Sequence, residues 1–283
     1  MIIKAIVENT TISDEYKSKH GLCLYVEAQG HKMLFDVGPN ALFLKNLEKM
    51  GIDVEEIDTV VISHGHADHG GGLEAFLEKN TRARIYIRKS AFQPHFIKVA
   101  KIPLRVSLDP KLINTGRFIF TKDVDMIDNG LVLISGVRGR NFPSVANTKL
   151  YVRKHKQMMN DDFMHEQSLL ITENERTALI SGCSHAGIVN IQKKAEHVHG
   201  DRIDLVVGGF HLYNPPTGKY ESDELIDGVA SALMEYGSAY YTCHCTGEKA
   251  YDRMKETMGD RLNYLATGDM IDTKKLAAWK ERI

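Results

Sequence analysis

The segment from His64 to His69 constrains the fold of this chain more than any other. It reads HGHADH, follows the apolar run VVI at residues 60–62, and is followed by three glycines. Alternate residues of a strand point to the same side, so His64 and His66 share one direction where the strand ends. Glycine allows a close turn of the backbone, which brings Asp68 and His69 toward the same point. The chain therefore places four candidate ligands at the end of a buried strand.

Imidazole and carboxylate groups in this number suit a divalent transition metal. Zinc binds histidine nitrogen and carboxylate oxygen at about 2.0–2.2 Å, and iron and manganese accept similar ligands. A solvated loop with incidental histidines is the alternative, but it does not require four such side chains within six residues. We predict one or two divalent ions per chain, with zinc preferred and iron or manganese as alternatives.

Short apolar runs alternate with helical patterns along most of the chain. The runs at residues 60–62 and 205–207 are apolar at every position, which is typical of strands covered on both faces. Strands interleaved with helices indicate an α/β architecture of sheets between helix layers. The last predicted helix spans residues 273–280. Residues 89–162 are more irregular, and we predict that they form an insertion over one end of a single domain, residues 1–283, partly as a lid.

The overall composition limits the classes of partner. The chain has 36 basic and 37 acidic residues and no basic stripe, so nucleic acid is not an expected partner. We find neither the apolar core of a signal peptide nor a run long enough to span a membrane, and we expect a cytoplasmic protein without membrane contact. Four cysteines in 283 residues are too few for a disulfide scaffold.

The HxHxDH motif at residues 64–69 resembles the signature of the metallo-β-lactamase superfamily. Further motifs of that family have counterparts in LFDVG at residues 34–38, GCSHAG at 182–187 and YTCHCTG at 241–247. The combination of SHAG, GGFHL and HCTG is similar to a narrower branch, the 7,8-dihydropterin-6-yl-methyl-4-(β-D-ribofuranosyl)aminobenzene-5′-phosphate synthase-like proteins. The resemblance implies a four-layer αββα sandwich over nearly the whole chain.

The resemblance also implies a set of metal ligands. One ion would be held by His64, His66 and His185, and a second ion by Asp68, His69 and His244. Most family members carry a bridging aspartate at the end of a late strand, but VVGGFHL at residues 206–212 has no carboxylate there. His211 stands near that position, either as a terminal ligand or facing the substrate. A single-metal resting state therefore remains an alternative.

The expected chemistry is hydrolysis of an ester, lactone or phosphoester of a small molecule. A divalent metal lowers the pKa of bound water to about 7, so hydroxide is available at neutral pH. Asp68 would be the catalytic residue, because it can bind metal and also orient that water. The branch resemblance implies an alternative, a transferase or synthase acting on a phosphorylated pterin precursor. An iron-dependent oxidoreductase is a third possibility.

Other polar side chains are candidates for supporting roles. Asp36 and Asp58 are predicted to orient histidine rings or to anchor loops. His165 is a candidate to face the substrate from the lid, with a surface position or a supporting position behind a ligand as alternatives. A basic stretch in the insertion could bind an anionic substrate group, or could simply be solvated. Its candidate substrate-binding residues are Arg138, Arg140 and Lys154.

Overall fold

The computed structural model describes residues 1–100 and 102–276 and contains two seven-stranded sheets. The first sheet has the order β20 (Met270–Asp272), β1 (Ile2–Val7), β2 (Cys23–Ala28), β3 (His31–Phe35), β4 (Thr59–Val61), β5 (Arg84–Ile87) and β8 (Phe118–Phe120). The second has the order β19 (Leu262–Tyr264), β18 (Ala239–Thr242), β15 (Leu205–Gly208), β14 (Arg176–Ile180), β13 (Gln167–Glu173), β10 (Leu131–Ser135) and β9 (Val124–Asp128).

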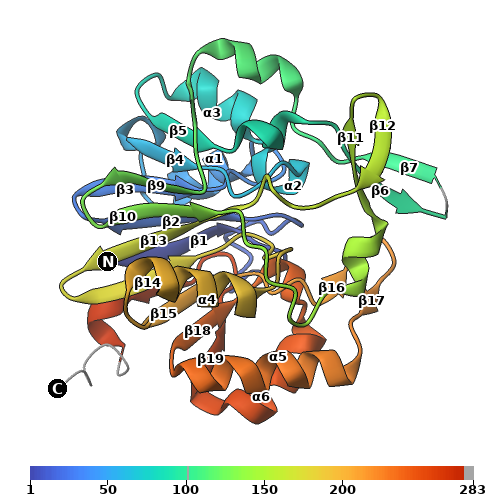
Figure 1. The fold of residues 1–283 in the computed structure, drawn as a ribbon. Coiled ribbons are helices and arrows are strands. Elements are labelled where there is room, and N and C mark those ends of the chain that lie inside the picture. The colour runs from blue at the N-terminus through green and yellow to red at the C-terminus, as the bar shows by residue number, and fades with distance from the viewer. Residues whose placement is uncertain (101, 277–283) are drawn as a thin grey trace.

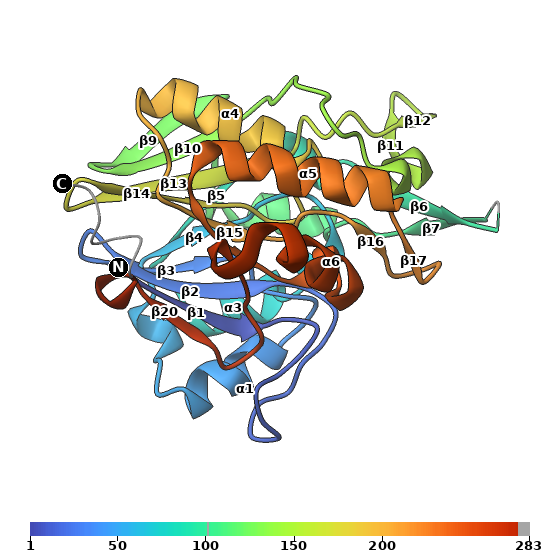
Figure 2. The ribbon, with the colours of Figure 1, turned by 90° about the horizontal axis from the view of Figure 1, so that it is seen from below.

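Helices cover the outer face of each sheet (Figure 1). The first sheet is covered by α1 (Leu42–Lys49), α2 (Ala67–Gly70) and α3 (Leu73–Lys79). The second is covered by α4 (Ile188–His199), α5 (Asp223–Tyr236) and α6 (Glu248–Met258), which lie side by side in Figure 2. The predicted four-layer αββα sandwich is therefore confirmed. No helix within the described part of the chain has the length and apolar character needed to cross a membrane.

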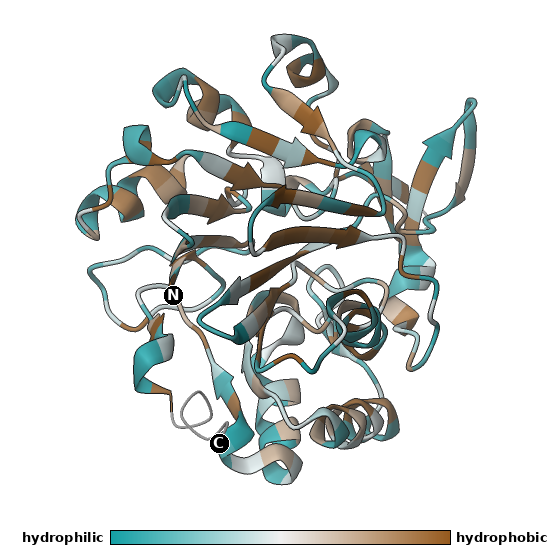
Figure 3. Cartoon of the chain, turned by 60° about the vertical axis from the view of Figure 1, so that its left-hand side comes forward, coloured by the Kyte–Doolittle hydropathy of each residue, from teal (hydrophilic) through white to brown (hydrophobic). Residues whose placement is uncertain are grey.

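Three hydrophobic clusters fill the three spaces between the four layers. Successive residues of one strand enter different clusters, because side chains alternate between the two faces of a sheet. In β15, Leu205 and Val207 pack between the sheets, whereas Val206 packs under the helices. In β4, Val61 faces the other sheet and Val60 faces α1 and α3. The uniformly apolar strands are thus buried on both faces, and Figure 3 shows hydrophobic residues concentrated on the central strands.

The predicted insertion at residues 89–162 is divided by the structure. Its middle part supplies β8 at the edge of one large sheet and β9 and β10 at the edge of the other. The rest forms a separate four-stranded sheet, with the order β12 (Gln157–Asn160), β11 (Leu150–Lys154), β6 (His95–Val99) and β7 (Ile102–Arg105). We call this element the projecting sheet, since it extends beyond one end of the sandwich (Figure 1).

The remaining elements are short. A two-stranded ribbon is formed by β16 (Tyr213–Asn214) and β17 (Lys219–Tyr220). Of the helix predicted at residues 273–280, Thr273–Lys275 forms a single 3₁₀ turn, and residues 277–280 lie outside the described residues.

In one half of each large sheet, neighbouring strands run parallel. β3, β4, β5 and β8 are parallel in one sheet, and β14, β15, β18 and β19 are parallel in the other. Parallel strands end at the same edge of a sheet, so the loops that follow them gather at one end of the sandwich. All the predicted metal ligands follow one of these strands.

Candidate metal centre

The HxHxDH loop follows β4 and begins the short helix α2. Gly65 fits against the neighbouring backbone so closely that a Cβ there would lie 2.4 Å from the Ala91 carbonyl oxygen. The backbone at this position therefore has no room for a side chain. His64 and His69 are fully buried, and Asp68 is partly exposed.

The first predicted ligand set comes together around His64. Its Nε2 atom lies 3.1 Å from Nδ1 of His66. The ring of His185, which follows β14, lies 4.9 Å from the His64 ring and 5.0 Å from the His66 ring, measured between centroids. Nε2 of His185 is buried and has no hydrogen-bond partner within the described residues. A ligand atom of His64 lies within 4.8 Å of one on His66 in one group, and within 4.8 Å of one on His185 in another.

The second predicted set, Asp68, His69 and His244, is equally compact. Nε2 of His69 lies 3.1 Å from Nε2 of His244, although 175 positions separate the two residues. Oδ2 of Asp68 lies 3.8 Å from the first of these nitrogens and 3.5 Å from the second. Two ligands that share one metal at about 2.0–2.2 Å lie about 3–4 Å apart, so these spacings suit a bound ion.

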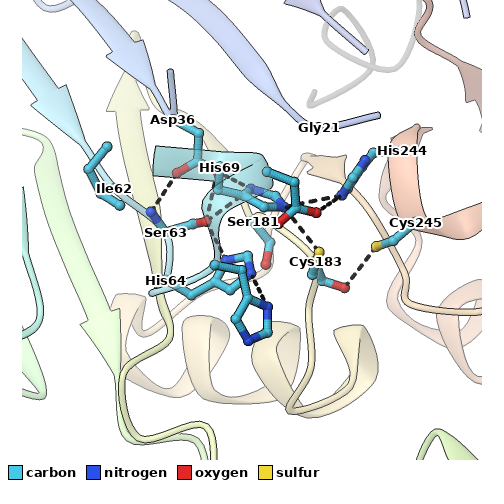
Figure 4. Close-up of polar contacts among 12 residues, drawn as sticks. Gly21, Asp36, Ile62, Ser63, His64, His69, Ser181, Cys183, His244 and Cys245 are labelled. Carbon is cyan, nitrogen blue, oxygen red and sulfur yellow. Dashed lines mark hydrogen bonds and ion pairs between the residues drawn. The ribbon is translucent and has the colours of Figure 1, made fainter. Parts of the chain in front are cut away.

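Hydrogen bonds on the outer side of each ring fix which nitrogen carries the proton. Nδ1–H of His69 donates to Oδ2 of Asp36 at 2.6 Å. The Ser63 hydroxyl donates to the same carboxylate oxygen at 2.7 Å, so it accepts from Nδ1–H of His64 at 2.8 Å. Both histidines therefore turn Nε2 toward the site, and Figure 4 shows the hydrogen bonds of this network.

Two asparagines likewise orient His185 and His244 by accepting a hydrogen bond from Nδ1–H of each ring. Nδ1–H of His185 donates to the side-chain carbonyl of Asn147 at 3.1 Å, and Nδ1–H of His244 donates to that of Asn9 at 3.1 Å. Four Nε2 atoms consequently turn toward a buried space, those of His64 and His185 in the first ligand set and those of His69 and His244 in the second. A divalent cation in each set would be bound by these nitrogens, so the donor sets fit metal.

The pKa values describe a site prepared for positive charge. Burial and the neighbouring histidines hold the pKa of His64 and of His185 well below the usual value, so both rings are neutral. Burial also acts to lower the pKa of His69, but Asp36 and Asp68 outweigh it and raise the pKa to about 9. In the metal-free protein this ring would hold a proton, which a bound cation would replace.

A second buried cluster supports the HxHxDH loop from behind. Nδ1 of His165 accepts a hydrogen bond from the Gly65 backbone N–H at 3.0 Å, and its Nε2–H donates to Asp161 at 3.2 Å. Nδ1–H of His95 donates to the same carboxylate oxygen at 2.8 Å. His165 thus lies behind the HxHxDH loop and supports its backbone. It does not belong to the cavity wall formed by the described residues. Sequence reasoning missed His95 and Asp161, which have no motif around them.

A cavity of about 360 Å³ opens over both ligand sets. Its apolar wall is formed by Ile97, Val106, Leu150, Pro215 and Pro216. His211 also lines the cavity, and its ring centroid lies 4.2 Å from that of His185. The projecting sheet contributes Ile97, Leu150 and Arg105, so part of the predicted lid does border the site.

Among the described residues, the one arginine or lysine that lines this cavity is Arg105, which the sequence analysis did not single out. The predicted anion-binding residues lie elsewhere. Arg138 is exposed away from the cavity lining, and Arg140 donates to the backbone carbonyls of Val137 and Gly139. Lys154 forms an ion pair with Asp162 at 2.7 Å. The structure therefore does not bring the predicted basic cluster to the candidate metal centre.

Comparisons with known proteins agree with this geometry. Residues 19–142 match a sequence model described as the Metallo-beta-lactamase superfamily. The chain is 27% identical, over 90% of both sequences, to a protein of Methanocaldococcus jannaschii named 7,8-dihydropterin-6-methyl-4-(beta-D-ribofuranosyl)-aminobenzene-5'-phosphate synthase. A solved structure titled a metal-dependent hydrolase of the beta-lactamase superfamily superposes with a TM-score of 0.80 at 31% identity, covering 96% of this chain and 98% of that one.

A more distant solved structure shares the fold alone. Zn(2+)-bound PqqB from Methylobacterium extorquens superposes with a TM-score of 0.58 at 11% identity, covering 96% of this chain and 100% of that one.

Proposed function

Because the chain belongs to the metallo-beta-lactamase superfamily, we propose that it is a metal-dependent hydrolase of a small-molecule ester, lactone or phosphoester. The observation that carries this proposal is the convergence of Nε2 atoms from His64, His69, His185 and His244 in one buried space. Nε2 of His185 is buried without a hydrogen-bond partner among the described residues, and Nε2 of His69 and Nε2 of His244 lie 3.1 Å apart, a spacing that suits two ligands of one cation. This is therefore an arrangement for binding metal rather than for stabilising the core.

The candidate ligands divide into two sets, and each set would hold one metal ion. His64, His66 and His185 would hold one ion, and Asp68, His69 and His244 a second. Metal at this place supplies a Lewis acid and a water of lowered pKa. Asp68 is the partly exposed member of the sets, and its Oδ2 lies 3.4 Å from Nε2 of His20 at the cavity. Its carboxylate can accept a hydrogen bond from the attacking water and pass its proton toward the cavity mouth.

The cavity indicates the kind of substrate. A volume of about 360 Å³ accommodates a small organic molecule, and the apolar wall would contact its uncharged part. Arg105 offers a planar set of donors that suits a phosphate or carboxylate group. The projecting sheet carries this arginine, and we propose that it acts as the substrate-selecting lid.

A synthase acting on a phosphorylated pterin precursor is the second candidate. It is favoured by the 27% identity, over nine tenths of the chain, to the Methanocaldococcus jannaschii protein bearing that name. Both candidates use the same metal centre, and a phosphorylated substrate is required by the synthase and is one option for the hydrolase. They differ in whether water or a second organic molecule attacks the substrate.

The test is a comparison of reactions on the metal-reconstituted protein. Zinc, manganese and iron forms would be incubated with a chromogenic phosphodiester, a phosphomonoester and a lactone, beside His66→Ala. We expect at least one substrate to be hydrolysed by the wild-type protein and not by the variant. Turnover indistinguishable from the variant for every hydrolytic substrate, with product formed only when a second organic substrate is supplied, would favour the synthase instead.

A further inference from the structure

The thiol of Cys183 lies between the two predicted metal positions. This residue is in the loop between β14 and His185, is 4% exposed, and its Sγ atom is 3.1 Å from Nε2 of His69 (Figure 4). Sγ forms a group within 4.8 Å with ligand atoms of the second set, Asp68, His69 and His244. It forms another such group with His64 and His185 of the first set. One sulfur atom is thus within reach of both sets.

The end of β15 cannot supply a bridging carboxylate. Gly208 has a φ of +148°, and a Cβ there would lie 2.2 Å from the Ser181 carbonyl oxygen. A Cβ on Gly209 would lie 2.4 Å from Sγ of Cys245. The backbone contact leaves no room for a side chain at Gly208, and a side chain at Gly209 would have to displace the buried Cys245 thiol. A ligand shared by two ions must therefore come from another segment of the chain.

We propose that Cys183 provides a thiolate that bridges the two metal ions, in place of a carboxylate from the late strand. This inference rests on the proposed metal-dependent function. On binding, the S–H bond breaks, its proton passes to solvent, and sulfur donates lone pairs to both ions, as a coordinated thiol does. Thiolate binds zinc at about 2.3 Å and favours softer ions over magnesium or calcium. The bridge would therefore select the metal as well as hold it.

Cys245 provides a matched control. Its Sγ–H donates to the Cys183 carbonyl oxygen at 3.3 Å, and it is buried beside the same cavity. It forms a candidate group with Cys183 and His211 but belongs to neither predicted metal set in the part of the chain that the structure describes. The Cys183 and Cys245 thiols thus share one buried environment, but only the Cys183 thiol lies within reach of both predicted metal sets in the described residues.

The experiment is zinc X-ray absorption spectroscopy on the intact protein loaded with two zinc equivalents. A phosphine reductant is used, since a thiol reductant would itself add sulfur. A bridging thiolate gives both ions one sulfur neighbour, so we expect about one Zn–S contact per zinc at about 2.3 Å. The contact should persist in Cys245→Ser and disappear in Cys183→Ser. The wild-type measurement needs no variant to fold.

Each other outcome identifies what is wrong. About half a sulfur per zinc, or uptake of only one zinc with one sulfur, would show a terminal ligand and overturn the bridge. Two zinc ions without sulfur would overturn the role of Cys183 and leave the proposed function intact. Failure to bind zinc would overturn both. As a further check, Cys183→Asp should bind two zinc ions without a sulfur contact, because it returns a carboxylate to the bridge.

Discussion

Oδ2 of Asp36 accepts a hydrogen bond from Nδ1 of His69 at 2.6 Å, with both side chains fully buried. The carboxylate also accepts from the backbone and the hydroxyl of Ser63, which in turn holds the ring of His64. One aspartate therefore sets the orientation of a ligand in each metal set. It does so from a left-handed backbone conformation, with φ of +61°.

The first prediction concerns this aspartate. Asp36→Asn should weaken metal binding about 10- to 100-fold, the usual effect of losing such a partner behind a metal ligand. Asparagine tolerates the left-handed conformation, so the fold should be retained. Asp58→Asn is the control, because Asp58 accepts a hydrogen bond from His31 at 2.8 Å, away from the metal ligands. Competition with a chromophoric chelator measures the affinity, and equal affinities for the two variants would contradict the assigned role.

The second prediction concerns metal content. Wild-type protein should retain one to two equivalents of zinc, iron or manganese, and His66→Ala should lose metal and hydrolysis together. The ring supplies a bond that no neighbour can replace, whereas the exposed His197 on α4 should be replaceable by alanine without effect. Elemental analysis and circular dichroism measure content and folding. Normal metal content in a folded His66→Ala protein would remove this residue from the ligand set.

The third prediction concerns Asp161 and pH. Burial acts against ionisation of this carboxyl, but His165 and His95 outweigh it and lower its pKa well below the usual value. A carboxyl with a lowered folded pKa stabilises the fold above its unfolded pKa of about 3.9, and this contribution is lost as pH falls below that value. Asp161→Asn should therefore lower the free energy of unfolding at pH 7 by about 1.5–3 kcal/mol, and by less at pH 3.

The adjacent carboxylate offers a control for that experiment. Asp162 is exposed and pairs with Lys154, so Asp162→Asn should change stability by less than about 1 kcal/mol at either pH. Urea unfolding at pH 7, 5 and 3 gives the required differences. A loss for Asp161→Asn that is the same at all three values would show that its charge does not stabilise the HxHxDH loop.

The fold and the contiguous motif were predictable because both depend on local patterns. The spacing of residues 60–69 predicts a buried strand followed by a loop of ligands. The structure confirms the sandwich that this pattern and the family resemblance imply. Helix α5 likewise carries its limits in the sequence, because its start is capped by Ser222 and its end is followed by Gly237 in a left-handed conformation. Signals of this kind lie within a few residues of what they determine.

Features created by contact between distant segments were not predictable. Asp161 meets His95 across 66 positions, and Cys183 meets His69 across 114. The division of residues 89–162 depends on which sheet edge each strand joins, a choice set by long-range pairing. Arg105 lies in a strand without a motif, and only the position of the projecting sheet brings it to the cavity.

The last prediction separates the two candidate sites for an anionic substrate. Arg105 lines the cavity, and within the described residues its guanidinium makes one hydrogen bond, from Nε to the Ser107 hydroxyl at 3.2 Å. Arg105→Ala should raise the KM of a phosphorylated substrate about tenfold, equivalent to about 1.4 kcal/mol, and leave that of a neutral ester nearly unchanged. The effect should weaken as salt is added, because the group is exposed.

The matched variant is the triple replacement of Arg138, Arg140 and Lys154 by alanine. It removes three charges from the same segment of the chain, but none of them lines the cavity within the described residues, so both KM values should stay at the wild-type level. Steady-state kinetics on both substrates at low and high salt distinguishes the two arrangements. The opposite result would be a rise in KM for the phosphorylated substrate in the triple variant and none in Arg105→Ala. It would show that the basic stretch, and not Arg105, binds the anionic group. The contrast between substrates is essential, since a general loss of activity in either variant would reflect a disturbed projecting sheet and leave both KM values shifted alike.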